Sequence, residues 1–147
     1  MTNKKKIIVI DACALEKTFF SKKFWKALKQ EHVIMVIGRE LMIKEYFRRI
    51  TAWKKEKDKY DRIRHAVIDL LRSAEYLSDS NFNKYRFEFT GEPPKSDDLQ
   101  LFIAAKEGAI KYGAKECIII STARDVLRVK DCKNSHNIKI LIKKEIN

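Results

Sequence analysis

Four short runs of apolar, mostly β-branched residues constrain the fold of this chain most strongly. They are IIVI at residues 7–10, VIMVI at 33–37, CIII at 117–120 and IKILI at 138–142. The first three have no polar alternation and predict strands that are buried on both faces, and the last predicts a further strand.

The segments between these runs have the periodicity of helices. We expect helices over residues 14–30, 39–50, 54–77, 98–111 and 125–129, and a loop over 78–95 that Pro93-Pro94 closes. Strands of this kind that alternate with helices are typical of a parallel sheet covered on both faces. The sequence therefore predicts a three-layer α/β/α fold with a central parallel sheet, as one domain over residues 1–147.

The chain is strongly basic, with 32 lysines and arginines against 20 aspartates and glutamates, and a formal net charge of +12. An excess of this size suggests a polyanionic partner, most often nucleic acid, because phosphates supply much of the affinity in such complexes. A solvated, lysine-rich surface is the alternative interpretation.

Cysteine usage and hydropathy bear on the compartment. Cys13, Cys117 and Cys132 form no C-x-x-C pair, and an odd number cannot all pair, which suggests a reducing compartment. No apolar run approaches the ~20 residues of a membrane span, and the apolar segment after MTNKKK is too short for a signal peptide. We therefore expect a cytoplasmic protein that does not enter a membrane.

Acidic residues stand near the ends of the predicted strands. Asp11 ends the first strand, Asp98 opens the helix that leads into the third, Asp125 follows the third, and Glu45 lies in the helix after the second. Ligands of parallel sheets bind at the carboxyl ends of the strands. We expect these four acids, distant in the chain, to meet at one edge of the sheet.

Some of these acids also have a structural interpretation. Asp11 could cap the helix that follows it, and Asp125 follows Thr122 at the spacing of a capping box. Glu45 is harder to explain in this way. It shares a helical face with Met42, where an unpaired carboxylate would be costly.

Asp97 and Asp98 stand side by side at a predicted helix start. Asp97 and Gln100 have capping-box spacing, so we expect Asp97 to cap the helix. Asp98 has the spacing of Leu101 and Ala105, the face that looks inward, so we expect it to point into the cleft.

A cluster of inward-facing carboxylates needs a counter-cation. Mg²⁺ or Mn²⁺ is the natural candidate, because these hard cations prefer carboxylate oxygens and also bind phosphate oxygens. A metal-held water is a better nucleophile, and the metal stabilises charge that develops on a phosphodiester. Acids, metal and basic surroundings together suggest phosphodiester hydrolysis.

The sequence resembles the PIN-domain family of nucleases. The match runs in family order through IIVIDACAL, RELMIKEYFRRI, SDDLQLFIAA and IIISTARDVL, and covers most of the chain. The resemblance implies a PIN-like fold and a metal-dependent endoribonuclease activity typical of the toxins of toxin–antitoxin pairs. It also allows a cognate antitoxin protein and a second copy of the chain as partners, besides RNA. The four positions that match the family's acidic motif are Asp11, Glu45, Asp98 and Asp125.

Two departures from the family pattern concern the neighbours of these acids. Cys13 stands where the family often has Asn or Ser, and the spacing from Thr122 to Asp125 is one residue longer than the usual T-x-D. The expected roles are metal binding by Asp11, Asp98 and Asp125, with Glu45 completing the site. Ser121 or Thr122 would orient a carboxylate or a water.

A basic arm over residues 44–64 is a candidate surface for RNA. Its basic side chains could neutralise phosphates, and the interleaved Trp53 and Tyr60 could stack on unpaired bases. The expected RNA-binding residues are Arg48, Arg49, Lys54, Lys55 and Lys57. A solvated helix with i,i+4 ion pairs explains the same pattern. An RNA-binding PIN-like module without catalysis, working inside a larger assembly, is the alternative to an enzyme.

Overall fold

A central sheet of five parallel strands forms the middle of the protein. The computed structural model describes residues 5–30, 32–38, 40–53, 55–77, 87–129 and 131–146. The strand order is β3-β2-β1-β5-β7, and every pairing between neighbours is parallel. The strands are β1 (Lys6–Ile10), β2 (Val33–Gly38), β3 (Glu75–Leu77), β5 (Glu116–Ile120) and β7 (Lys139–Lys143). The α/β fold with a parallel sheet is confirmed.

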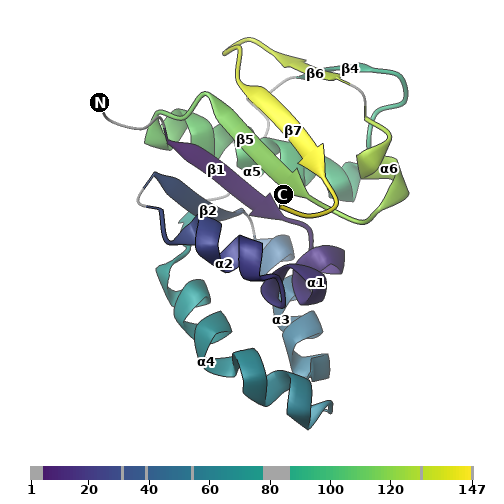
Figure 1. The fold of residues 1–147 in the computed structure, drawn as a ribbon. Coiled ribbons are helices and arrows are strands. Elements are labelled where there is room, and N and C mark those ends of the chain that lie inside the picture. The colour runs from purple at the N-terminus through teal and green to yellow at the C-terminus, as the bar shows by residue number, and fades with distance from the viewer. Residues whose placement is uncertain are drawn as a thin grey trace.

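Helices flank this sheet, with α5 behind it and α2 in front of it in Figure 1. A two-stranded antiparallel ribbon of β4 (Phe87–Thr90) and β6 (Asp131–Asn134) lies beside the main sheet. The helices are η1 (Ala12–Ala14), α1 (Leu15–Phe19), α2 (Lys22–Leu28), α3 (Glu40–Trp53), α4 (Lys57–Ser73), α5 (Ser96–Tyr112) and α6 (Arg124–Leu127).

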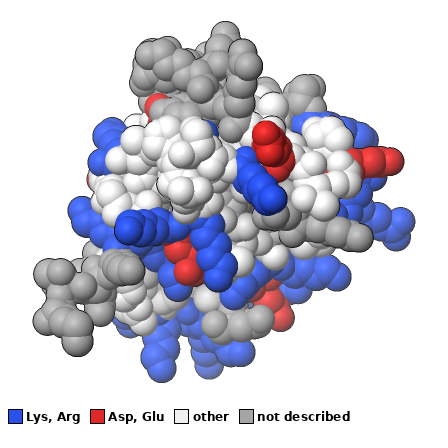
Figure 2. All heavy atoms as spheres, turned by 90° about the horizontal axis from the view of Figure 1, so that it is seen from above, with Lys and Arg blue, Asp and Glu red and all other residues white. Residues whose placement is uncertain are grey.

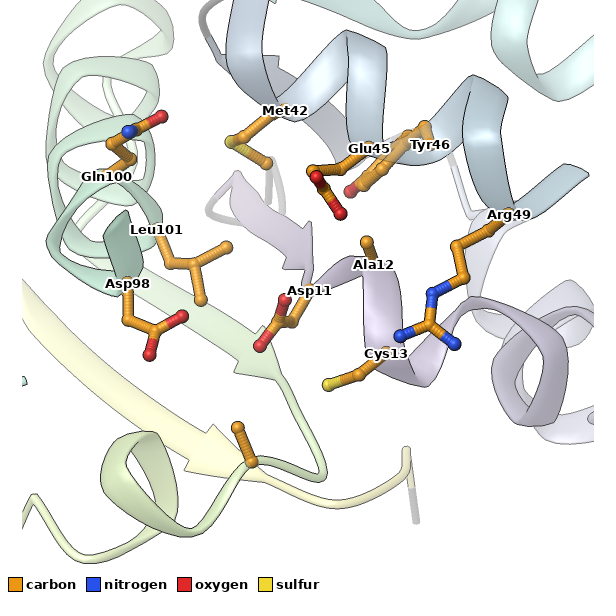
Figure 3. Close-up of a pocket in the computed structure, with 11 residues that line it drawn as sticks. Asp11, Ala12, Cys13, Met42, Glu45, Tyr46, Arg49, Asp98, Gln100 and Leu101 are labelled. Atoms are coloured by element: carbon orange, nitrogen blue, oxygen red, sulfur yellow. The ribbon is translucent and has the colours of Figure 1, made fainter. Parts of the chain in front are cut away.

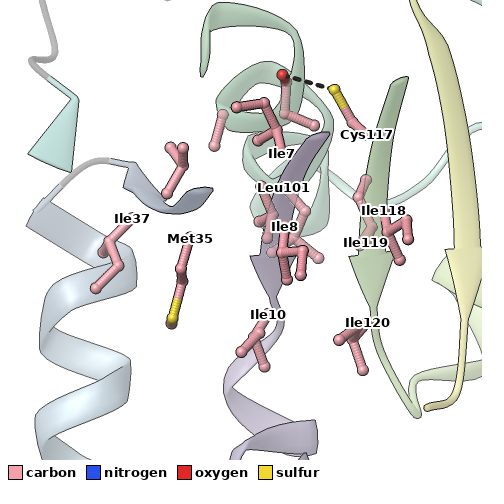
Figure 4. Close-up of a cluster of buried hydrophobic side chains, with 14 of the residues drawn as sticks. Ile7, Ile8, Ile10, Met35, Ile37, Leu101, Cys117, Ile118, Ile119 and Ile120 are labelled. Atoms are coloured by element: carbon pink, nitrogen blue, oxygen red, sulfur yellow. Dashed lines mark hydrogen bonds between the residues drawn. The ribbon is translucent and has the colours of Figure 1, made fainter. Parts of the chain in front are cut away.

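One part of the core lies between the sheet and α5. Figure 4 shows the isoleucines of β1 and β5 packed together, and the Cys117 thiol donates a hydrogen bond of 3.1 Å to the carbonyl of Ala105 on α5. Gly38, the last residue of β2, allows a close approach to the same helix. A Cβ at this position would lie 2.7 Å from the Cβ of Ala104. The carboxyl end of the sheet and the start of α5 are therefore held close together.

The order of the strands creates a topological switch point between β1 and β5. From β1 the chain moves to β2 and β3 on one side, and then crosses to β5 and β7 on the other. The connections at the carboxyl ends of β1 and β5 thus leave in opposite directions, which opens a crevice where ligands of such sheets bind. Asp11 and Ser121 are the first residues after these two strands.

Several element boundaries differ from the prediction. The helix expected over 14–30 is two helices, because the chain breaks at Ser21, whose side chain accepts a hydrogen bond from the Phe24 amide and caps α2. The helix expected over 54–77 ends at Ser73, and residues 75–77 form the edge strand β3. The loop expected over 78–95 contains β4, and residues 78–86 lie outside the described part of the chain.

Positive charge is widely spread over the surface. Figure 2 shows lysines and arginines around most of the visible face, with a few acidic side chains among them. Within the described ranges, no helix is both long and apolar enough to cross a bilayer.

Candidate functional site

A pocket of about 320 Å³ lies at the switch point, between the ends of β1 and β5 and the helices α3 and α5. Figure 3 shows the carboxylates of Asp11 and Asp98 facing each other across it, with Glu45 pointing in from α3. The lining residues are Asp11, Ala12, Cys13, Met42, Glu45, Tyr46, Arg49, Asp98, Gln100, Leu101 and Ala123. Three of the four predicted acids therefore line one pocket.

Asp11 is held by Ser121, the residue that follows β5. The Ser121 hydroxyl donates a 2.7 Å hydrogen bond to Asp11 Oδ2, and accepts one of 3.1 Å from the Ala123 amide. Ser121 is fully buried. The Asp11 side chain makes no capping hydrogen bond to η1. The alternative of a simple helix cap is therefore not observed, and of the two hydroxyl residues expected to orient a carboxylate or a water, Ser121 contacts Asp11.

Asp98 contacts Asp125 at the start of α6. A hydrogen bond from the Asp98 side chain lowers the pKa of Asp125 below its usual value, and backbone hydrogen bonds and the charge of Lys95 act in the same direction, against desolvation. Among the described residues, Asp125 Oδ2 is buried without a hydrogen-bond partner. Two carboxyl groups in this contact need either a shared proton or a cation between them.

The capping box predicted for Thr122 and Asp125 does not form. The N-cap of α6 is Ala123, whose backbone is extended, and no side chain caps the helix. Thr122 is exposed and lies before the cap. The extra residue between Thr122 and Asp125 thus shifts the helix start, and the hydroxyl that reaches an acid belongs to Ser121.

The prediction that Asp97 caps α5 is wrong. The helix begins at Ser96, and Lys95, with an extended backbone at φ −62° and ψ 158°, occupies the N-cap position. Asp97 is the second residue of the helix, and its side chain lies outside the described part of the structure. An acidic residue in the first turn still interacts favourably with the helix dipole. Asp98 is half-buried and lines the pocket, as predicted.

Glu45 lines the pocket but has a basic partner. Arg48 Nη2 lies 2.7 Å from Glu45 Oε2, one turn along α3, and the side chain of Glu45 is 41% exposed. The expectation that this carboxylate is unpaired is therefore wrong. The ion pair makes its partial burial less costly. Glu45 therefore differs from Asp11, which accepts a hydrogen bond from a hydroxyl, and from Asp98, which contacts a second carboxyl group.

Two pocket residues, Tyr46 and Cys13, were not predicted as site residues. Tyr46 is buried, and its hydroxyl donates a hydrogen bond to the carbonyl of Ile10, the last residue of β1. Burial raises the pKa of Tyr46 far above its usual value, and the charge of Asp11 adds to this effect. Cys13 Sγ lies 3.8 Å from Ser121 Oγ. Tyr46 directly follows Glu45, and Cys13 stands two residues after Asp11. This closeness to predicted acids is the signal by which the sequence could have indicated them.

The basic residues expected to bind RNA have different positions. Arg49 is exposed and lines the pocket on the side opposite Asp98 in Figure 3, and Lys55 is exposed beyond the end of α3. Arg48 is exposed and paired with Glu45. Lys54 lies outside the described residues, as do the side chains of Lys57 and Tyr60.

The prediction that Trp53 stacks on bases is wrong. Its side chain is 7% exposed and packs edge-on against Phe19, with ring centroids 6.1 Å apart. Trp53 belongs to the core that joins α3 to α1.

The acids fit a hard divalent cation in their chemistry. Carboxylate oxygens are the ligands that Mg²⁺ and Mn²⁺ prefer, and the buried Asp125 Oδ2 lacks a partner among the described residues. In the same part of the chain, no three Asp, Glu, His or Cys side chains already lie at the spacing that a metal ion requires. Asp11 would therefore have to move toward the Asp98–Asp125 pair for all three to bind one ion. Comparison of the chain with family models, with curated proteins and with solved structures found no significant match.

Proposed function

We propose that this chain is a PIN-like, three-layer domain that hydrolyses phosphodiester bonds of RNA with Mg²⁺ or Mn²⁺. The observation that carries the proposal is the pair of carboxyl groups, Asp98 and Asp125, in contact at the switch point with Asp11 across the pocket. Such a contact costs energy when both carboxyl groups are ionised, since like charges repel, and a cation bound between them would remove this repulsion.

Asp11, Asp98 and Asp125 would hold the metal in this proposal. The metal would supply a charge for the scissile phosphate and a water of lowered pKa as nucleophile. The protein's own contribution is to fix these acids. Ser121 orients Asp11, and Tyr46 secures the carbonyl just before it. Arg49, on the other side of the pocket, would neutralise a phosphate as the RNA enters.

An RNA-binding module without catalysis is the second candidate. The basic surface favours it, because a net charge of +12 supports binding to a polyanion whether or not cleavage follows. The two candidates differ in what the acids do. A binding module has no use for carboxylates facing each other in a pocket that phosphates must approach, because they would repel the ligand.

The proposal extends to partners through the resemblance to toxins of toxin–antitoxin pairs. An antitoxin would be a small protein encoded beside this chain, and a second copy of the chain could complete a dimer. Co-expression with the neighbouring reading frame, followed by co-purification, tests the first partner, and light scattering tests the second.

RNA cleavage with and without a chelator tests the function. We expect the wild-type chain to cut single-stranded RNA in Mg²⁺ or Mn²⁺ and to lose this activity in EDTA. Asp98→Asn should reduce cleavage by orders of magnitude. Asp69→Asn, an exposed acid on α4, is the matched control and should retain the wild-type rate. Cleavage that persists in EDTA would contradict a metal mechanism, and RNA binding without any cleavage would favour the binding module.

A further inference from the structure

Gln100 is a buried polar residue whose side-chain oxygen has no hydrogen bond among the described residues. It lies on α5 and is 8% exposed. Because α5 begins at Ser96, the capping box that would have given Gln100 a structural role does not form. A buried acceptor left without a hydrogen bond costs stability, so its presence needs another explanation.

The position of Gln100 in the pocket supplies one. Figure 3 shows it at the end of the pocket near Met42, with Leu101 between it and Asp98. Met42 and Leu101 are 6% and 4% exposed, so this end of the pocket is apolar apart from the carboxamide. Asp11 and Asp98 occupy the other end, and Glu45 points into the pocket beside Met42.

This division matches the shape of a nucleotide. A phosphate near the acids and their cation would direct its attached base toward Met42 and Leu101. Both side chains are almost fully buried, so the base would have to part them to reach the Gln100 oxygen, and Met adapts well to flat ligands. The volume of about 320 Å³ lies at the lower end of the range of small-ligand pockets, about 300–1,000 Å³. One nucleotide is therefore the appropriate size of ligand.

We propose that Gln100 is a specificity residue that accepts a hydrogen bond from the amino group of an adenine base next to the scissile phosphate. This inference rests on the proposed ribonuclease function and names the base that the same site selects. A carboxamide matches the adenine edge with two hydrogen bonds, one from the N6 amino group and one to N7. Bases of single-stranded RNA are free to present such edges.

The test deletes one amino group from the RNA. Each adenosine of a labelled single-stranded oligoribonucleotide is replaced in turn by purine riboside, which lacks the N6 amino group. Binding is measured in EDTA and cleavage in Mg²⁺, for the wild type, Gln100→Leu and Gln30→Leu. Leucine is close to glutamine in size without its polar atoms, and Gln30 is an exposed control.

We expect one adenosine position where the replacement weakens wild-type and Gln30→Leu binding about 10-fold, and where Gln100→Leu no longer discriminates. The melting temperature of Gln100→Leu should not fall, because the side-chain oxygen that it removes has no hydrogen bond among the described residues. The inference is wrong if the wild type binds every substituted RNA equally, if Gln100→Leu still discriminates, or if its melting temperature drops as for a structural hydrogen bond. If binding depends on Gln100 through the 2′-hydroxyl, as a 2′-deoxy substitution would show, and not through the N6 amino group, Gln100 contacts the ribose and the proposed base contact is wrong.

The two readouts separate this inference from the proposed function. Discrimination in EDTA without any cleavage in Mg²⁺ would refute the nuclease and leave base recognition by Gln100 standing. Cleavage in Mg²⁺ without discrimination in either assay would refute base recognition by Gln100 and leave the nuclease standing.

Discussion

Ser121 donates its hydroxyl hydrogen to Asp11 over 2.7 Å, although 110 positions separate the two residues in the chain. The register of the sheet brings the two residues together. Ile10 pairs with Ile120, so Asp11 and Ser121, which follow them, lie at the same edge of the sheet. The Asp11 amide also donates to the Ile120 carbonyl at 2.8 Å. The first acid of the site is thus positioned by the pairing of β1 with β5.

Removing this hydroxyl should damage the site and the fold together. Ser121→Ala leaves Asp11 Oδ2 and the Ala123 amide without their hydrogen bonds to Ser121. We expect the free energy of unfolding to fall by about 1–3 kcal/mol, and RNA cleavage to fall further than this loss of folded protein explains. Thr122→Ala, at the neighbouring exposed position, is the control and should change neither. Denaturant unfolding and initial cleavage rates check this, and a Ser121→Ala variant with normal cleavage would show that Asp11 needs no orientation.

The loss of folding stability at acid pH should depend on Asp125. Its pKa is lowered in the folded protein, first by the hydrogen bond from Asp98. A lowered folded-state pKa means that the ionised carboxylate stabilises the fold above its unfolded-state pKa of about 3.9, and that this contribution disappears as the pH falls through the folded-state value. Asp125→Asn should therefore flatten the loss of stability below about pH 4.

Melting temperatures between pH 7 and pH 2 in EDTA measure this effect. Asp69→Asn, which changes an exposed acid on α4, should keep the wild-type slope. If Asp125→Asn has that slope as well, the contact between Asp98 and Asp125 contributes nothing to the folded state.

Arg49 should contribute one phosphate contact. It is exposed and lines the pocket, and Glu45 of the same helix pairs with Arg48. Arg49→Ala should weaken the binding of single-stranded RNA and reduce the slope of log affinity against log salt by about 0.7, the value for one phosphate on a single strand. Lys139→Ala changes an exposed residue at the amino end of β7, away from the site, and should leave the slope unchanged. A slope unaltered in Arg49→Ala would place the RNA elsewhere on the basic surface.

The sequence predicted the strands that have short apolar runs. β1, β2 and β5 contain continuous apolar runs rich in β-branched residues, which favour buried strands, and β7 falls on a similar run interrupted by Lys139. β3 has three residues and β4 has four, too few for periodicity to register against the neighbouring helix or loop. Edge and ribbon strands of this length depend on tertiary pairing, which a local pattern does not contain.

The sequence predicted some residues of the site and not others. Asp11 and Asp98 were found from strand ends and helical spacing, and both line the pocket. The sequence left open whether Ser121 or Thr122 contacts an acid, and it gave no role to Tyr46 or Gln100, because these roles depend on where a helix starts or on how two strands are paired. Trp53 was misassigned for the same reason. Its basic neighbours suggested an exposed surface, whereas its ring packs against Phe19.

Titration of the chain with Mn²⁺ in a calorimeter tests the central claim, that the acids of the switch point hold a catalytic cation. We expect the wild type and Asp69→Asn to bind the ion and to gain thermal stability in its presence, since a ligand of the folded state stabilises it. Asp98→Asn should lose both the binding and the gain in stability. Mn²⁺ binding that is absent from the wild type, or that survives unchanged in Asp98→Asn, would contradict the account.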